Sequence, residues 1–232
     1  MSWRKRSIPL TASPAAESLA TAADRLITVA KGLQKTMPDD EVLGEQAALR
    51  LSRMASEVEE LASGKLVFGS TETWRAVYEA VLAGCRQRRY LSVAVIETED
   101  YWRDRPGRAS LEFNYRLVQH GFHVGRTLIV DEFFWPEKSD LPDKQLLRWA
   151  KAQHDEGIAV SIARLSEVED DLRLDFGVYG ERAVGYQVVD ERGRTERYML
   201  LFDAASRQLA EDRWRRLELF VEPLDDLLAR CS

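Results

Sequence analysis

The feature that most constrains the fold is an alternation of strand-like and helix-like segments in the middle of the chain. Three apolar, β-branched runs predict strands, and two segments with apolar residues at helical spacing lie between them: 90–96, 109–120, 122–130, 142–156 and 158–163. Gly121 and Gly157 follow the two helical segments, as expected where a helix ends. This order predicts a parallel sheet whose strands are joined by right-handed helical crossovers.

After residue 171 the pattern changes to one of consecutive strands. Residues 172–179, 183–190 and 195–202 predict an antiparallel meander, with turns at Gly180-Glu181 and Arg192-Gly193. A last helix is expected from residue 204 to about residue 221. The predicted fold class is therefore α/β with a mixed sheet, in which parallel strands with helical crossovers continue into an antiparallel meander.

The first part of the chain has a different character, because it is rich in alanine and predicts two long helices. Their apolar residues recur at steps of three and four, as in a helical hairpin or a coiled-coil seam: Leu19, Ala23, Leu26, Ala30, Leu33, Leu43, Ala47, Leu51, Met54, Val58 and Leu61. One interpretation is an arm for dimerisation or for docking a partner protein. The alternative is that these helices cover one side of the following domain.

These observations divide the chain into four parts. They are a flexible N-terminus (1–12), a helical hairpin (13–63), an α/β domain (66–222) and a tail (223–232).

Composition excludes several classes of function. The net charge of −6 favours neither nucleic acid nor an acidic membrane surface, so we expect no nucleic-acid partner. The chain has two cysteines without a CxxC pair and three histidines without metal spacing, so we expect no metal and no cofactor. No run spans a bilayer and the basic start lacks an apolar signal region, which predicts a cytoplasmic protein without integral membrane association.

Candidate binding residues gather where the predicted parallel strands end, since ligands of open α/β sheets collect there. Glu97 and the Tyr101-Trp102 pair follow the first strand, Asp131 follows the second, and Arg164 follows the third. Acidic, aromatic and basic side chains on one rim suit a polar ligand or a peptide. Decoration of wet loops by such residues is the equally simple alternative.

Two polar residues inside apolar patterns add to this set. Asn114 falls near the buried side of its helix, where a buried amide either anchors the helix or lines a pocket. Asp175 alternates with apolar neighbours, and if it is buried it needs a cationic partner. Arg126, Arg173 and Arg182 are the candidates for that partner.

The order of elements, together with Trp102, Asn114, Gly121 before a strand and the hairpin 172–187, resembles the phospholipase D-like superfamily, in particular the bacterial branch that lacks the catalytic signature. Active members carry His-x-Lys-x4-Asp at the start of such a hairpin. That resemblance places Arg173 at the histidine position, Asp175 at the lysine position and Gly180 at the aspartate position. Without an imidazole the covalent phosphohistidine route is closed.

The resemblance therefore implies the phospholipase D-like fold and argues against its reaction, so no catalytic residue is assigned. We expect a binding, sensing or scaffold module that is not an enzyme. We expect it to form a homo-oligomer or bind a partner protein through residues 13–63. One alternative is a phosphodiesterase or nuclease with an unconventional site built from Asp175, Arg173, Arg182 and His123. A second alternative is a peripheral phospholipid-binding module.

Overall fold

The chain divides into two compact units, residues 1–59 and residues 60–232. The computed structural model describes residues 14–36, 41–99, 105–137, 139–189 and 195–230. The predicted flexible N-terminus, residues 1–12, therefore lies outside the described residues.

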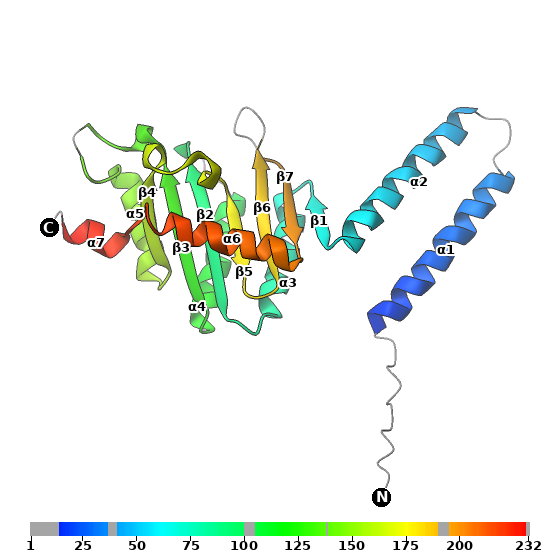
Figure 1. The fold of residues 1–232 in the computed structure, drawn as a ribbon, viewed down its shortest axis with the longest axis horizontal. Coiled ribbons are helices and arrows are strands. Elements are labelled where there is room, and N and C mark those ends of the chain that lie inside the picture. The colour runs from blue at the N-terminus through cyan, green and yellow to red at the C-terminus, as the bar shows by residue number, and fades with distance from the viewer. Residues whose placement is uncertain (1–13, 37–40, 100–104, 138, 190–194, 231–232) are drawn as a thin grey trace, which may run out of the picture. The chain divides into compact units, whose positions relative to one another are not determined.

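Two long helices occupy the N-terminal part of the chain (Figure 1). Helix α1 spans Pro14–Thr36 and helix α2 spans Glu41–Ala62. Proline at the first position of α1 is favourable, because its missing N–H would have no partner inside the helix. None of the residues of α2 is buried, so its apolar side chains remain in contact with solvent.

The second unit is built on one mixed sheet in the order β1-β7-β6-β5-β2-β3-β4-β8 (Figure 1). The strands are β1 (Lys65–Phe68), β2 (Arg89–Ile96), β3 (His123–Val130), β4 (Ala159–Arg164), β5 (Phe176–Tyr179), β6 (Ala183–Val189), β7 (Thr195–Leu201) and β8 (Glu222–Pro223). Strands β2, β3 and β4 are parallel, and β5, β6 and β7 form an antiparallel meander. The predicted α/β fold class with a mixed sheet is confirmed.

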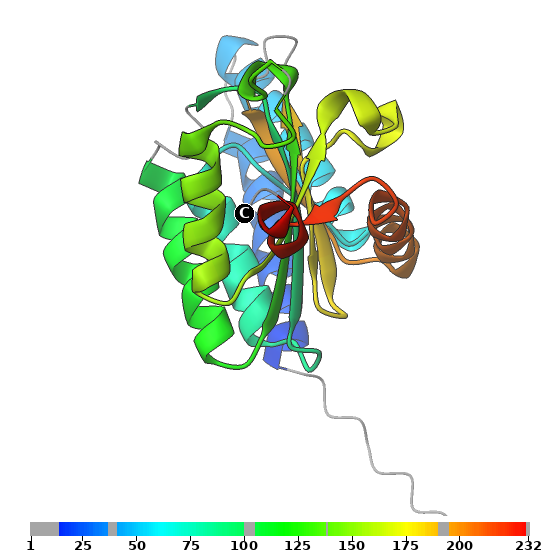
Figure 2. The same ribbon diagram turned by 90° about the vertical axis from the view of Figure 1, so that its left-hand side faces the viewer.

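Helices cover both faces of this sheet (Figure 2). Helices α3 (Thr71–Ala83), α4 (Arg105–Gln119) and α5 (Lys144–Asp155) contribute to one buried cluster. Helix α6 (Ala204–Leu217) contributes to the other, together with Val168 and Leu172 from the segment after β4. Because α4 and α5 each connect two parallel strands, they lie on the same face, as the alternating sequence pattern predicts.

The β5–β6 hairpin and the C-terminus differ in detail from what the sequence predicts. The predicted strand 172–179 begins only at Phe176, because residues 170–172 form a short 3-10 helix that buries Leu172 against the α6 face. Where the sequence suggested a tail, Leu224–Ala229 form helix α7. Leu224 and Leu227 are its buried residues, so apolar burial holds this last turn in place.

Three buried tyrosines stack beneath α3 and join it to the sheet. The ring of Tyr179 lies 5.5 Å from that of Tyr78 and 5.4 Å from that of Tyr90, measured between centroids. The phenol of Tyr179 reaches over Gly177 and Gly185, which have no side chain to obstruct it. A Cβ at residue 185 would lie 2.6 Å from the Tyr179 hydroxyl oxygen.

We predict that Gly185→Ala destabilises the protein by about 1–3 kcal/mol, because stacking on both sides prevents the ring of Tyr179 from moving away. Urea unfolding measures the change. Gly69→Ala is the matched control, since a Cβ there meets nothing within 4 Å. Equal stability of the two variants would contradict this account of the packing.

Candidate functional site at the carboxyl edge of the sheet

The parallel strands end together at one edge of the sheet, here named the carboxyl edge. Strands β2, β3 and β4 reach it at Ile96, Val130 and Arg164. Strand β5 begins at the same edge, because it runs antiparallel to β2 and Phe176 pairs with Val93. The side chains that follow β2, β3 and β4 and precede β5 therefore lie near one another.

Asp175 occupies the position where β5 joins this edge. Its Oδ1 accepts a hydrogen bond from the backbone N–H of Val95 at 3.0 Å, so the side chain supplies a partner just beyond the last β2–β5 pair. The residue keeps some contact with solvent, yet burial of the carboxyl group raises its pKa to about 7. The Val95 hydrogen bond lowers this pKa and the negative charge of Glu97 raises it.

Helix N-termini also point towards the carboxyl edge, because each crossover helix runs antiparallel to the strands it joins. Asp143 caps α5 by accepting hydrogen bonds from the backbone N–H groups of Gln145 and Leu146 at 2.6 and 3.0 Å. Asp131 accepts one from the N–H of Phe133 at 2.8 Å. The partial positive charge of helix N-termini stabilises such carboxylates. This explains part of the acidic character of the edge.

Arg164 is a cation of this edge, and three neighbours hold it. Its guanidinium lies 4.0 Å from the centre of the Trp135 ring. It donates a hydrogen bond to the backbone oxygen of Ser139 at 2.7 Å and lies 3.6 Å from a carboxylate oxygen of Glu132. Trp135 is itself anchored by its Nε1–H, which donates to the oxygen of Val130 at 3.3 Å. Aromatic stacking and hydrogen bonds thus keep the guanidinium in one orientation.

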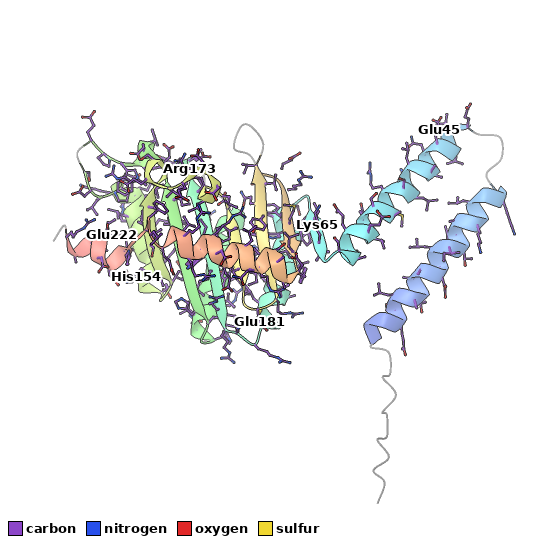
Figure 3. The ribbon with its side chains drawn as sticks, viewed as in Figure 1. Glu45, Lys65, His154, Arg173, Glu181 and Glu222 are labelled. Atoms are coloured by element: carbon purple, nitrogen blue, oxygen red, sulfur yellow. The ribbon has the colours of Figure 1, made fainter. Side chains whose placement is uncertain are left out.

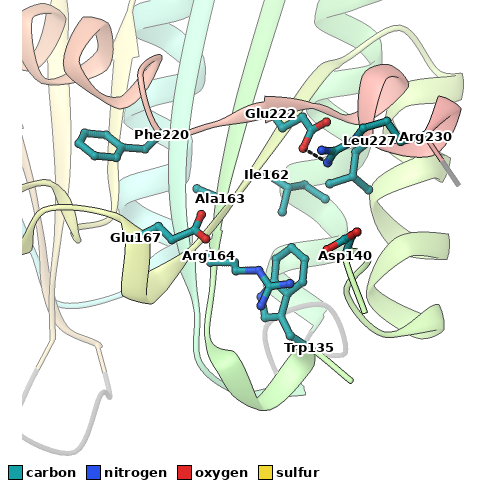
Figure 4. Close-up of a pocket in the computed structure, with 10 residues that line it drawn as sticks. All are labelled: Trp135, Asp140, Ile162, Ala163, Arg164, Glu167, Phe220, Glu222, Leu227 and Arg230. Atoms are coloured by element: carbon teal, nitrogen blue, oxygen red, sulfur yellow. Dashed lines mark hydrogen bonds and ion pairs between the residues drawn. The ribbon is translucent and has the colours of Figure 1, made fainter. Parts of the chain in front are cut away.

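Beside Arg164 lies a cavity of about 230 Å³ (Figure 4). Its lining comes from β4, β8, α7 and the loops near them: Trp135, Asp140, Ile162, Ala163, Arg164, Glu167, Phe220, Glu222, Leu227 and Arg230. Glu222 and Arg230 form an ion pair on one wall (Figure 4). The cavity is large enough for a small polar ligand, and it includes residues from the loop 131–140 that the sequence analysis placed on the rim.

Two of the predicted site residues lie on the face of the sheet that α4 and α5 cover, where Asn114 is buried and Arg126 is partly buried. Asn114 is 1% exposed, and among the described residues its Oδ1 has no hydrogen-bond partner. Arg126 donates hydrogen bonds to Ser92 at 3.2 Å and to Gln153 at 2.7 Å, on the face covered by α5. Arg126 is therefore held by neutral groups and not by Asp175. Trp102 lies outside the described residues.

The two other predicted arginines lie at opposite ends of the sheet. Arg173 belongs to the carboxyl edge, where it donates a hydrogen bond to the oxygen of Val168 and forms an ion pair with Asp170, both at 2.8 Å. Arg182 lies in the β5–β6 turn next to Gly84, at the amino edge. Figure 3 shows this separation through Arg173 and the neighbour of Arg182, Glu181. Asp175 and Arg182 do not converge.

All histidines of the chain lie at the amino edge. His120 follows α4 and its Nδ1 lies 2.6 Å from the oxygen of Arg116, while His123 begins β3 opposite Arg89. His154 lies near the end of α5, and its Nε2 is 3.0 Å from a carboxylate oxygen of Asp225. Val95 is six residues along β2 from Arg89, which corresponds to roughly 20 Å at about 3.3 Å per residue. No imidazole of the chain therefore reaches Asp175.

Within the described ranges, no cluster of three or more His, Cys, Asp or Glu side chains suits a metal ion. None of the helices in the described part of the chain has the length and apolar character needed to cross a bilayer.

No protein-family model and no curated protein matches the chain. Several solved structures are similar to it. The archaeal chromatin protein TrmBL2 shares 13% identity over 86% of this chain and 69% of its own, with a TM-score of 0.43. Nuc from Salmonella typhimurium, a phospholipase D family member, shares 8% identity over 68% of this chain and 97% of its own, with a TM-score of 0.46. NucT from Helicobacter pylori shares 8% identity over 68% of this chain and 98% of its own, with a TM-score of 0.47. TM-scores below 0.5 decide neither family nor activity.

The raised pKa of Asp175 gives a testable pH dependence of stability. Below about pH 4 the carboxyl is protonated in both the folded and the unfolded state, and between pH 4 and 7 only the unfolded state ionises it. Wild type thus loses stability over this range, by up to about 4 kcal/mol at about 1.4 kcal/mol per pKa unit. Asp175→Asn avoids this loss and keeps an acceptor for Val95, so its advantage in urea unfolding grows from pH 4 to 8.

Glu167→Gln is the control for this experiment, because it removes a carboxylate from an exposed residue of the same edge. Its stability difference from wild type should change little with pH. A constant difference between wild type and Asp175→Asn from pH 4 to 8 would show that the carboxyl is not desolvated.

A second prediction compares two buried amides. Gln153 is 0% exposed, accepts from Arg126 and donates to the oxygen of Trp149, so Gln153→Leu should cost about 2–3 kcal/mol. Asn114→Leu removes a carbonyl oxygen that has no partner among the described residues, so its effect should stay within about 1 kcal/mol. Urea unfolding of both variants measures the contrast. An equal loss in both would mean that Asn114 makes bonds as strong as those of Gln153.

Proposed function

We propose that residues 66–222 form a non-catalytic binding or scaffold module on a phospholipase D-like fold that lacks the catalytic signature, in a cytoplasmic protein that associates with itself through residues 13–63. The ligand or partner binds at the carboxyl edge, near Asp175 and the cavity beside Arg164. The site takes a neutral or cationic polar group, and it does not cleave phosphodiesters.

The observation that carries this proposal is the chemistry around Asp175. A phosphodiester-cleaving site of this superfamily needs an imidazole nucleophile and a cation for the phosphate oxygens. Asp175 stands at the lysine position of the resemblance, and Arg173 stands at the histidine position. Arg173 is engaged by Val168 and Asp170, and every histidine lies at the amino edge. The groups that would perform the reaction are therefore not assembled at this edge.

The electrostatics of the edge supports the same conclusion. Glu97, Asp140 and Glu167 lie along it without an ion pair to any described residue. Arg164 and Arg173, in contrast, already lie beside carboxylates. An anionic phosphate would meet uncompensated carboxylates here, whereas a cation or an uncharged donor would be attracted.

The alternative set of catalytic residues is divided between the two edges. Asp175 and Arg173 lie at the carboxyl edge, and Arg182 and His123 lie at the amino edge. A general base must come within hydrogen-bond distance of the proton that it removes. These four residues are too far apart to act on one phosphodiester, so this alternative receives no support from the geometry.

The proposal predicts that full-length protein hydrolyses neither bis(p-nitrophenyl) phosphate, nor a labelled DNA duplex, nor phosphatidylcholine above the buffer rate. Wild type and Asp175→Ala are compared with and without Mg²⁺, and urea unfolding confirms that both are folded. The expected result is no turnover by either protein. Turnover by wild type would refute the non-catalytic assignment, and its loss in Asp175→Ala would identify the unconventional active site.

A further inference from the structure

The helices α1 and α2 carry apolar faces whose side chains are exposed in the structure. Leu19 is 71% exposed, Leu26 is 39%, Val58 is 55% and Leu61 is 54%. Most helical stability in proteins comes from tertiary packing of an apolar face and not from the intrinsic helix propensity of its residues. These faces therefore require a partner.

The apolar residues follow a heptad pattern in both helices. In α1, Leu19, Leu26 and Leu33 recur every seven residues, and Ala23 and Ala30 lie between them at the second seam position. In α2, Ala47, Met54 and Leu61 occupy one seam position at intervals of seven residues. Leu51 and Val58 occupy the other. Such seams are the contact surfaces of coiled coils and helical bundles.

The apolar face is wider than a two-stranded coiled coil needs. Ile27 and Val29 flank the α1 seam on its two sides and are 53% and 51% exposed, and Leu43 flanks the α2 seam and is 54% exposed. A strict seam of two positions suits two strands, whereas an apolar face that extends to flanking positions suits a helix with two neighbours. Within one chain each of these helices has one other long helix available as a neighbour, and a second copy of the chain supplies the further neighbours that the wide faces suit.

The charges beside the α2 seam identify that molecule. Arg50 and Glu57 flank the seam on the same side, and neither has an ion pair with a described residue. When two copies of α2 run antiparallel, with Leu51 of each copy opposite Met54 of the other, Arg50 of each copy lies beside Glu57 of the other. A two-fold axis makes this contact occur twice, which is the reciprocity of an isologous interface.

The same two-fold arrangement suits α1. Antiparallel pairing of two α1 helices places Leu26 opposite Ala23 and Leu19 opposite Ala30, so each large side chain meets a small one. Interdigitation of large and small residues is how helix cores reach their packing density. Both helices are thus complementary to themselves in the antiparallel orientation.

We propose that two copies of this chain join through an antiparallel four-helix bundle, in which α2 packs on α2 and α1 on α1 of the second copy, with reciprocal Arg50–Glu57 pairs. This inference rests on the self-association proposed above and specifies its partner, its surface and its register. The proposed bundle does not depend on the ligand site. Turnover in the hydrolysis assay would therefore refute the non-catalytic assignment alone, and a monomeric mass would refute self-association alone.

The first experiment measures the mass of the full chain by sedimentation or light scattering. Wild type should have about twice the chain mass of 26.5 kDa. Val58→Glu, at the α2 seam, should have the mass of one chain. Leu49→Glu is the matched control, because Leu49 is 63% exposed on the opposite side of the same helix, and this variant should stay dimeric.

The results separate two failures. A monomeric wild type would refute self-association itself. A dimeric Val58→Glu variant would leave self-association standing and refute the seam as its surface. Dissociation by Leu49→Glu to the same extent as by Val58→Glu would also refute the proposed surface.

The second experiment tests the register by charge reversal. Arg50→Glu places two glutamates together at each contact, and Glu57→Arg places two arginines together, so each variant alone should dissociate at least 10-fold more readily than wild type. An equimolar mixture should form a heterodimer, because every contact then joins Arg to Glu. Recovery to the wild-type dissociation constant supports the antiparallel register, and absence of recovery in the mixture would overturn it.

Discussion

The structure depends most on the pairing of β2 with two neighbours of opposite direction. β2 runs parallel to β3 and antiparallel to β5, and it thereby joins the crossover half of the sheet to the meander. Its side chains contribute to both buried clusters, with Ala94 and Ile96 in one and Leu91 and Val93 in the other. A strand buried on both faces tolerates no polar interruption that lacks a partner, and Ser92 meets this requirement through Arg126.

The direction of β2 also determines the electrostatic polarity of the domain. Because α4 and α5 return antiparallel to the strands, their N-termini face the carboxyl edge and their C-termini face the amino edge. A carboxylate such as Asp143 is stabilised at the first edge, and a cation such as Arg116 at the second. The acidic character of the carboxyl edge is thus partly a consequence of how parallel sheets are covered by helices.

Sequence reasoning placed the long elements well and the site residues only in part. Segments 90–96 and 122–130 were recognised because strands buried on both faces are continuous apolar runs, which depend on local composition alone. Strands β1 and β8 were missed, because these short edge segments are strands only through pairing with β7 and β4. Glu222 and Arg230 were missed as cavity residues for the same reason, since β8 and α7 bring them beside Arg164.

By itself, the sequence determined the mixed α/β architecture, the helical character of residues 14–36 and 41–62, and the amphipathic seams, because each depends on periodicities within a few turns or one strand. Only the tertiary structure decided that Asp175 and Arg182 lie at opposite edges, that Arg126 bonds to Ser92 and Gln153, and that a cavity opens beside Arg164. These outcomes depend on strand direction and register, through which residues distant along the chain come into contact, and no local pattern records them.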